Sequence, residues 1–329
     1  MKKTLKIIGI IIVLIIVFLT AAPFLFKGSL EKMVKRTINE NLNATVAWEG
    51  LDLSLFRNFP EATLTISNFS VINNDPFEGD TLVSGRSLRL NLGITQLFNK
   101  SDEAIQVDGL LLNESLLNIK IDSLGNANYD IALKKEENIS DLSGADEASF
   151  SFALKNYEIK DSRINYLDES SKTFLILTDV NHTGKGDLSK AISKIETQTE
   201  ANATFLINQT EYFSKNSITL NANFELDLEN QKYSFLENVA KINELPLTFN
   251  GFIKINETNS ELDISFKTPS SDFKNFLGVI PKTYVKELDG VTTTGNFMID
   301  GILRGIIDET HIPRMDIKIV SEDASFKYP

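Results

Sequence analysis

The chain of 329 residues lacks cysteine and has only 2 histidines. The absence of cysteine excludes disulfide scaffolds, thiolate zinc sites and cysteine nucleophiles. A Ser-His-Asp triad would have to use His182, in a polar glycine-bearing segment, or His311, beside Pro313. The segment around His182 lacks the pattern of a phosphate-binding loop, so we expect both histidines to be surface residues. The sequence therefore predicts no catalytic residue, no metal site, no cofactor and no enzymatic activity.

Basic residues are scarce outside the N-terminal region. Lys+Arg 33 and Asp+Glu 45 give a net charge of 33 − 45 = −12. Residues 1–36 hold seven basic residues and the single acid Glu31, a net charge of +6, so the remainder carries −12 − 6 = −18. A body this acidic is a poor partner for nucleic acid, which we exclude.

One long uncharged run is present, residues 7–26. As a helix it would reach roughly 30 Å, the thickness of a hydrocarbon core. We predict a transmembrane anchor that includes Ile7, Ile12, Ile16, Phe18 and Phe26, with residues 1–6 as a basic cytoplasmic tip. The alternative is a cleaved signal peptide, whose apolar region would be unusually long. Both alternatives export the body.

Residues 27–42 follow with apolar positions at helical spacing, among them Leu30, Val34 and Ile38. This pattern predicts a short amphipathic helix. The helix could lie on the membrane surface through Lys32, Lys35 and Arg36, or it could cap the structure that follows.

Beyond residue 43 the dominant hydrophobic period is two, which is typical of strands with one face turned from water. The clearest run is 220–228, where apolar residues alternate with Asn, Glu and Asp. We predict a mainly β protein with one elongated, curled antiparallel sheet, formed by residues 43–133 and 150–329 and joined by a flexible acidic loop at 134–149.

Few helices are expected in this body. Apolar spacing indicates helices at 187–195, at 233–242, and in an insert at 270–289 that Pro281 divides. A weak internal repeat relates Asn113–Ile119 to Lys160–Tyr166, at an offset of 47 residues. The chain stops directly after a strand-like alternation, so we expect it to be the N-terminal part of a longer protein.

The order of these segments resembles the AsmA-like family of bacterial envelope proteins. The resemblance rests on the N-terminal apolar segment, on FPEATL at 59–64 and PFEGDTL at 76–82, and on the stretches KNYEIKDSRINY and FKTPSSDFKNFLGVIPKTYVKELDG. It runs over essentially the whole chain. None of these motifs is a catalytic signature.

The resemblance implies a protein anchored in the inner membrane, N-terminus in the cytoplasm, with its body in the periplasm. It implies a curled sheet whose apolar groove handles or conducts phospholipids for outer-membrane biogenesis. The partners would be acyl chains, the inner membrane and outer-membrane or envelope proteins. A scaffold for outer-membrane protein assembly without lipid transport remains the alternative, and an exported hydrolase is a third hypothesis.

Periodicity alone does not separate an open groove from a closed sandwich or barrel that its own side chains fill. With the resemblance we favour the groove. Its predicted lining comprises Leu64, Ile66, Leu88, Leu90, Leu92, Leu117, Ile119, Ile121, Phe150, Phe152, Leu220, Phe224, Leu226, Leu228, Phe249 and Ile253.

Overall fold

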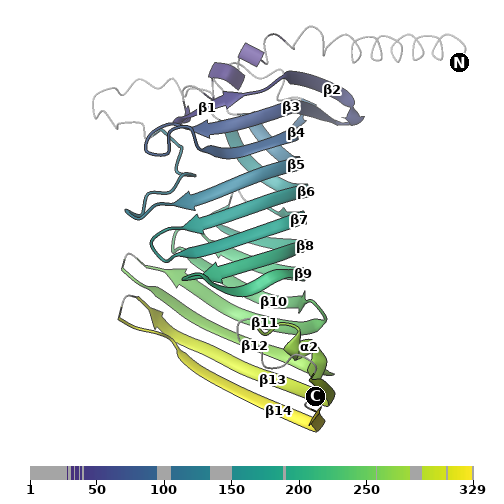
Figure 1. Ribbon diagram of the computed structural model, residues 1–329. Helices are drawn as coiled ribbons and strands as arrows, with labels where there is room; N and C mark the ends of the chain where they lie inside the picture. Colours follow the sequence, from purple (N-terminus) through teal and green to yellow (C-terminus); the bar gives the residue numbers. More distant parts are fainter. Residues whose placement is uncertain are drawn as a thin grey trace, which may run out of the picture. The chain divides into compact units, whose positions relative to one another are not determined.

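The structure is a computed structural model (Figure 1). It describes residues 28, 31–32, 34–36, 38, 41–94, 105–133, 150–187, 190–256, 258–281, 291–308 and 310–327. The predicted anchor at 7–26, the tip at 1–6 and the acidic loop at 134–149 lie outside these residues. Within the described part of the chain, no helix is both long and apolar enough to span a bilayer. The described residues between 28 and 41 are helical, as predicted, and Val34 is buried among them.

The chain divides into two compact units. Unit 1 comprises residues 1–115 and 128–153, and unit 2 comprises residues 116–127 and 154–329. Two strands, β5 (Ile105–Ile121) and β6 (Phe150–Asp168), contribute residues to both. The other strands of unit 1 are β1 (Ala44–Ala47), β2 (Gly50–Asn58), β3 (Glu61–Asn73) and β4 (Thr81–Gly93).

Unit 1 is a sheet with a sealed apolar face. Strands β1 and β2 both pair antiparallel with β3, and β3 pairs antiparallel with β4. The register places Leu53, Leu64 and Leu90 side by side on one face. All three are buried, which indicates that protein atoms cover this face.

Unit 2 is built from consecutive antiparallel strands that follow their order in the sequence. They are β6, β7 (Thr173–Gly186), β8 (Ile192–Ile207), β9 (Thr210–Asp227), β10 (Lys232–Ile242), β11 (Leu245–Ile255), β12 (Ser260–Asp272), β13 (Thr292–Ile307) and β14 (Arg314–Lys327). The strand order does not return to β6 among the described residues, so this sheet is open. The predicted mainly β, antiparallel architecture is confirmed.

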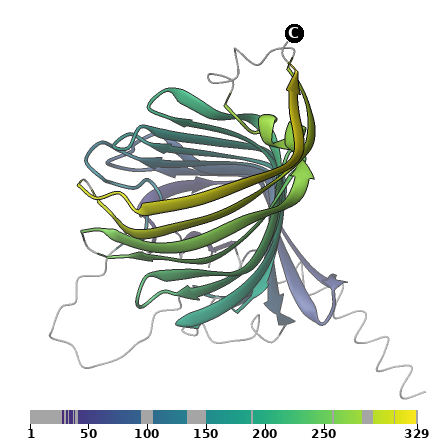
Figure 2. The same cartoon turned by 90° about the horizontal axis from the view of Figure 1, so that it is seen from below.

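The strands of unit 2 bend along their length (Figure 2), and bulges explain the bend. Asp161, Asp179 and Lys215 adopt left-handed backbone angles, with φ of 45°, 54° and 54°. Near such bulges, asparagine side chains accept hydrogen bonds from backbone N–H groups. The Asn181 Oδ1 accepts from the Asp161 N–H at 3.3 Å, and the Asn243 Oδ1 accepts from the Ser217 N–H at 2.9 Å.

The two copies of the predicted repeat share one local geometry. Glu114 and Asp161 occupy equivalent positions and have φ of 48° and 45°. In each copy the next residue, Ser115 or Ser162, is buried, and its hydroxyl donates to the carbonyl two residues earlier, at 3.3 and 2.6 Å. The repeat is therefore a recurrent left-handed residue followed by a buried serine in β5 and β6, and in β6 it coincides with a bulge.

Three helix predictions need correction. Residues 233–242 form β10, and Ile192–Ile195 open β8. Of the insert at 270–289, the structure describes only Phe273–Leu277 as a helix, α2, and residues 282–290 lie outside the described part. In β10 a bulge follows Phe235 and shifts the apolar residues by one position, so their spacing imitates a helix.

The close approach of β11 and β12 gives a stability prediction. Gly251 has φ of +134°, and a Cβ there would overlap the carbonyl oxygen of Asp263. Gly251→Ala should lower the free energy of unfolding by about 1–3 kcal/mol. Urea denaturation of the full chain, followed by circular dichroism, measures this change.

Gly50→Ala is the matched control, because its Cβ would meet the Ser67 Cβ at an ordinary 3.7 Å. An unchanged urea midpoint for Gly251→Ala would contradict the strained geometry at this position.

Candidate functional site

The register of unit 2 gathers apolar side chains on one side of the sheet. Directly paired residues share a face, and Phe224 pairs with Ile195 on one side and Phe235 on the other. Following these pairs from strand to strand defines the apolar face. From β8 to β14 it comprises Ile195, Leu220, Ala222, Phe224, Leu226, Tyr233, Phe235, Leu247, Phe249, Ile253, Ile264, Phe266, Ile299, Leu303, Met315, Ile317 and Ile319.

Aromatic rings form a row across the middle of this face. The ring centroids of Phe224 and Phe235 are 5.7 Å apart, and those of Phe235 and Phe249 are 5.8 Å apart. Phe266 pairs with Phe249 and continues the row, and its ring occupies the space that a side chain at Gly301 would need. Contacts between neighbouring rings thus form a continuous aromatic row across the apolar face.

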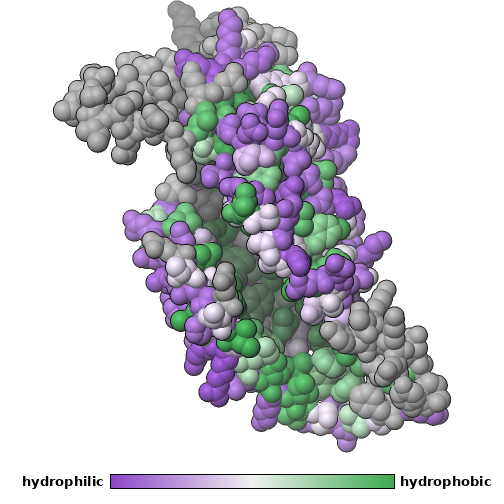
Figure 3. All heavy atoms as spheres, turned by 60° about the vertical axis from the view of Figure 1, so that its left-hand side comes forward, coloured by the Kyte–Doolittle hydropathy of each residue, from purple (hydrophilic) through white to green (hydrophobic). Residues whose placement is uncertain are grey.

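The apolar face is incompletely covered. Most of its residues are half-buried, and Met315 and Ile319 on β14 are 61 % and 56 % exposed. Figure 3 shows hydrophobic residues gathered in a hollow in the lower part of the molecule, at the level of β10–β14 in Figure 1. All strands described in unit 2 belong to one sheet, so no second sheet among them covers this side.

The opposite face of unit 2 is polar. Cross-strand ion pairs there join Lys194 Nζ to Glu225 Oε2 at 3.6 Å and Lys267 Nζ to Asp300 Oδ2 at 3.0 Å. Arg304 also binds Asp263 through two hydrogen bonds of 2.9 and 3.1 Å. Such exposed pairs stabilise the fold little, but they mark this face as the solvated one.

The short helix α2 covers part of the apolar face. Phe276 and Phe273 pack on the buried Phe297 of β13, with ring centroids 5.1 and 5.6 Å away. After the helix, the Gly278 carbonyl accepts from the Asn243 Nδ2 at 2.9 Å. The two rings of the helix thus cover the buried Phe297, while no residue of α2 is itself fully buried.

The predicted lining residues fall into distinct environments. Leu220, Phe224, Leu226, Phe249 and Ile253 lie half-buried on the apolar face of unit 2. Half-buried positions are also found for the β5 residues Leu117, Ile119 and Ile121, and for Leu88 in unit 1.

Other predicted residues are sealed or displaced. Protein atoms bury Leu64 and Leu92, each 2 % exposed, and also Ile66 and Leu90. Leu228 lies in the turn after β9 rather than on a strand. The side chains of Phe150 and Phe152 lie outside the described part. Sequence reasoning missed Tyr233 and Phe235, because the segment around them was interpreted as a helix.

His182 was predicted to be a surface residue, and this prediction is wrong. It lies in β7, its ring centroid is 5.3 Å from that of Tyr157, and its Nδ1 is 2.8 Å from the Thr199 Oγ1. Burial lowers the pKa of His182 and raises the pKa of Tyr157. Both shifts favour the neutral side chains, as expected of groups packed in the sheet.

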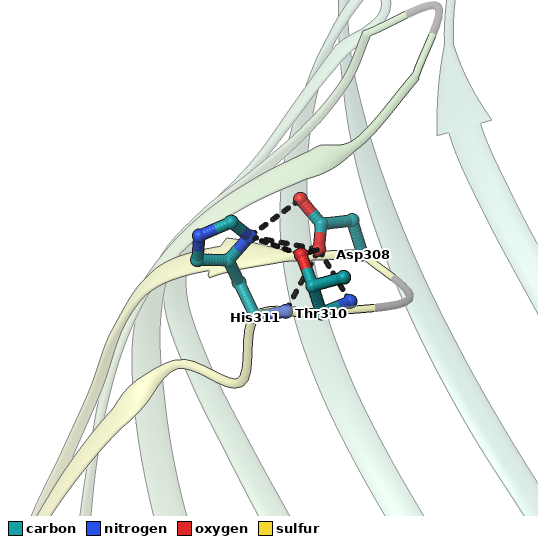
Figure 4. Close-up of polar contacts among 3 residues, drawn as sticks. All are labelled: Asp308, Thr310 and His311. Carbon is teal, nitrogen blue, oxygen red and sulfur yellow. Dashed lines mark hydrogen bonds and ion pairs between the residues drawn. The ribbon is translucent and has the colours of Figure 1, made fainter.

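His311 lies in the exposed loop between β13 and β14 (Figure 4). The Asp308 Oδ1 accepts from the amides of Thr310 and His311, both at 2.7 Å. These hydrogen bonds, with those from both side chains, hold the pKa of Asp308 well below its usual range.

This cluster closes a turn and does not form a catalytic triad. The Thr310 hydroxyl and the Asp308 carboxylate both contact the same ring atom, Nδ1 of His311, at 2.9 Å. In a triad the hydroxyl and the carboxylate contact opposite ring nitrogens. Over the described ranges, no group of three His, Cys, Asp or Glu residues could hold a metal ion.

A model of the AsmA family matches residues 1–275. The chain belongs to the AsmA family. The match extends from the first residue into α2 and includes most strands of the apolar face in this AsmA-family chain. No curated protein and no solved structure matches the chain significantly.

The half-buried His182 generates a pH prediction. Because the pKa of His182 is lowered from 6.5 in the fold, the unfolded chain binds the proton first as the pH falls. The free energy of unfolding should therefore decline as the pH drops below about 6.5. His182→Gln should reduce this dependence between about pH 7.5 and 5.5, measured by urea denaturation.

Thr183→Ser serves as the control, because it changes an exposed neutral side chain next to His182 and adds or removes no titrating group, so the pH dependence should stay as in the wild type. An identical pH profile for wild type and His182→Gln would contradict the assigned environment of His182.

Proposed function

We propose that this AsmA-family chain is an envelope protein whose unit 2 binds phospholipid acyl chains on its apolar face. Residues 7–26 would anchor it in the bacterial inner membrane, and the body would lie in the periplasm. The single observation that carries the proposal is the open apolar face, which pairs a continuous hydrophobic surface with incomplete burial.

The energetics favour hydrocarbon as the occupant. Soluble proteins rarely leave more than a few hundred Å² of contiguous apolar surface in water. Each methylene removed from water contributes about 0.8 kcal/mol, so a tail laid along the face would be held by many small contributions. The six steps from β8 to β14, at ~4.8 Å per pair of strands, extend the surface over roughly 29 Å.

The arrangement would act passively. Acyl chains would slide over the rings of Phe224, Phe235 and Phe249, while headgroups stayed in water. These three phenyl rings carry no hydrogen-bonding group, so they would not fix a lipid headgroup at one position. Direction would then come from partner proteins or from a difference in lipid concentration. A protein scaffold that uses the same face for client strands is the competing function.

Phe224→Asp tests the proposal in the full chain. A carboxylate in the middle of the apolar face would have to be desolvated under a bound tail, which is costly. We expect several-fold less co-purified phospholipid, measured by extraction and native mass spectrometry.

Asn223→Asp is the matched control, because it adds the same charge one residue away on the polar face. Any lipid held by the N-terminal segment is common to both variants. Equal lipid recovery from both, with unchanged circular dichroism, would contradict lipid binding at the apolar face and favour the scaffold.

A further inference from the structure

The hairpin between β2 and β3 in unit 1 carries apolar residues at an exposed tip. Residues 56–60 are all exposed, with Phe56 at 49 % and Phe59 at 66 %. The nearest inward-facing side chains of the two strands are buried, since Leu55 is 1 % exposed and Ala62 is 0 % exposed. The two phenylalanines therefore stand outside the core of unit 1.

The alternation of side chains in β2 does not place Phe56 in the hydrophobic core. Leu51, Leu53 and Leu55 alternate on the buried face of β2, with Asp52 and Ser54 between them. Phe56 follows in the polar phase of this alternation. A phenyl ring left in water forgoes the gain of burial, so a pair of them at one tip indicates an interaction surface.

Hydrogen bonds hold the tip in place. The Arg57 N–H donates to the Ser54 Oγ at 3.2 Å, and the Arg57 Nη1 donates to the Thr65 Oγ1 at 3.4 Å. The Asn58 Nδ2 donates to the Asn91 Oδ1 of β4 at 3.0 Å. The rings are thus presented from a braced hairpin, which lowers the entropic cost of binding.

The tip shares one edge of unit 1 with basic residues. Because β1 and β2 both pair with β3, together they form the edge of this sheet. The helical residues lie at the same edge, where the Lys35 Nζ is 5.5 Å from the Trp48 ring centroid. Lys32, Lys35 and Arg36 are exposed, and all three lie within about ten residues of the apolar segment 7–26 in the sequence.

We propose that Phe56 and Phe59 insert into the interface of the bilayer that holds residues 7–26, with Arg57 at its anionic headgroups. Aromatic rings beside a basic residue suit this boundary, where the apolar body is buried and the cation meets phosphate. The inference rests on the proposed membrane anchoring, but not on lipid binding by unit 2.

The cysteine-free chain allows a direct test. Phe59→Cys in the full chain, labelled with an environment-sensitive NBD dye, is reconstituted into vesicles of phosphatidylethanolamine and phosphatidylglycerol. We expect blue-shifted emission that spin-labelled lipids quench. Ser170→Cys, in the exposed turn between β6 and β7, should report water and resist quenching.

A second substitution tests the other ring. Phe56→Ser in the Phe59→Cys background should weaken the blue shift, and an unchanged shift would overturn the assignment of Phe56.

The other outcomes separate the two proposals. If the protein floats with the vesicles but the Phe59→Cys label reports water, the inference is overturned. That result would indicate that the tip binds a protein partner instead. It would leave the proposal of lipid binding by unit 2 intact. Protein that does not float with the vesicles refutes the anchoring itself, and this inference falls with it.

Discussion

Unit 2 depends on cross-strand pairing that keeps apolar residues opposite apolar residues. Side chains alternate with a period of two, so one extra residue in a strand would move every later side chain to the other face. At each bulge two residues lie opposite one residue of the neighbouring strand, so the extra residue is absorbed and later side chains keep their face. In β7 the register with β8 shifts between Thr178 and Asn181. Leu177, Val180 and His182 nevertheless all stay on the apolar side, opposite Ile164, Ser162 and Ile159 of β6. The same irregularities that bend the strands thus preserve the continuity of the face.

This constraint explains which parts of the fold the sequence predicts. In β9 the alternation from Leu220 to Leu226 is uninterrupted, and both the strand and its apolar side are predictable. In β10 the bulge after Phe235 changes the spacing of the apolar residues. The hydrophobic pattern of this segment then resembles that of a helix. The bulges leave only a weak sequence signal, because Asp161 and Asp179 belong to a residue type enriched in the left-handed conformation but Lys215 does not.

The candidate site was predictable in kind but not in extent. Alternation identifies a face that avoids water, and it does not say what covers that face. Leu64 and Phe224 stand in equally regular patterns, yet the first is sealed in unit 1 and the second remains half-buried in unit 2. The difference arises from tertiary packing, which the hydrophobic period does not encode. The AsmA-family match supports an envelope role for the chain, and the residues that would carry it come from the register alone.

The two exposed apolar surfaces differ in a way that bears on their roles. The face of unit 2 is broad, continuous over several strands and free of charge along its row of rings, so a flexible hydrocarbon chain could shift along it without meeting a barrier. The tip of unit 1 is small, braced by hydrogen bonds and adjacent to Arg57. A small apolar point beside a cation suits a fixed boundary between water and lipid, where movement along the surface brings no gain. Under the two proposals each surface would meet a different part of a lipid, the tails in one case and the headgroup region of a bilayer in the other, and the acidic remainder of the chain would stay in water.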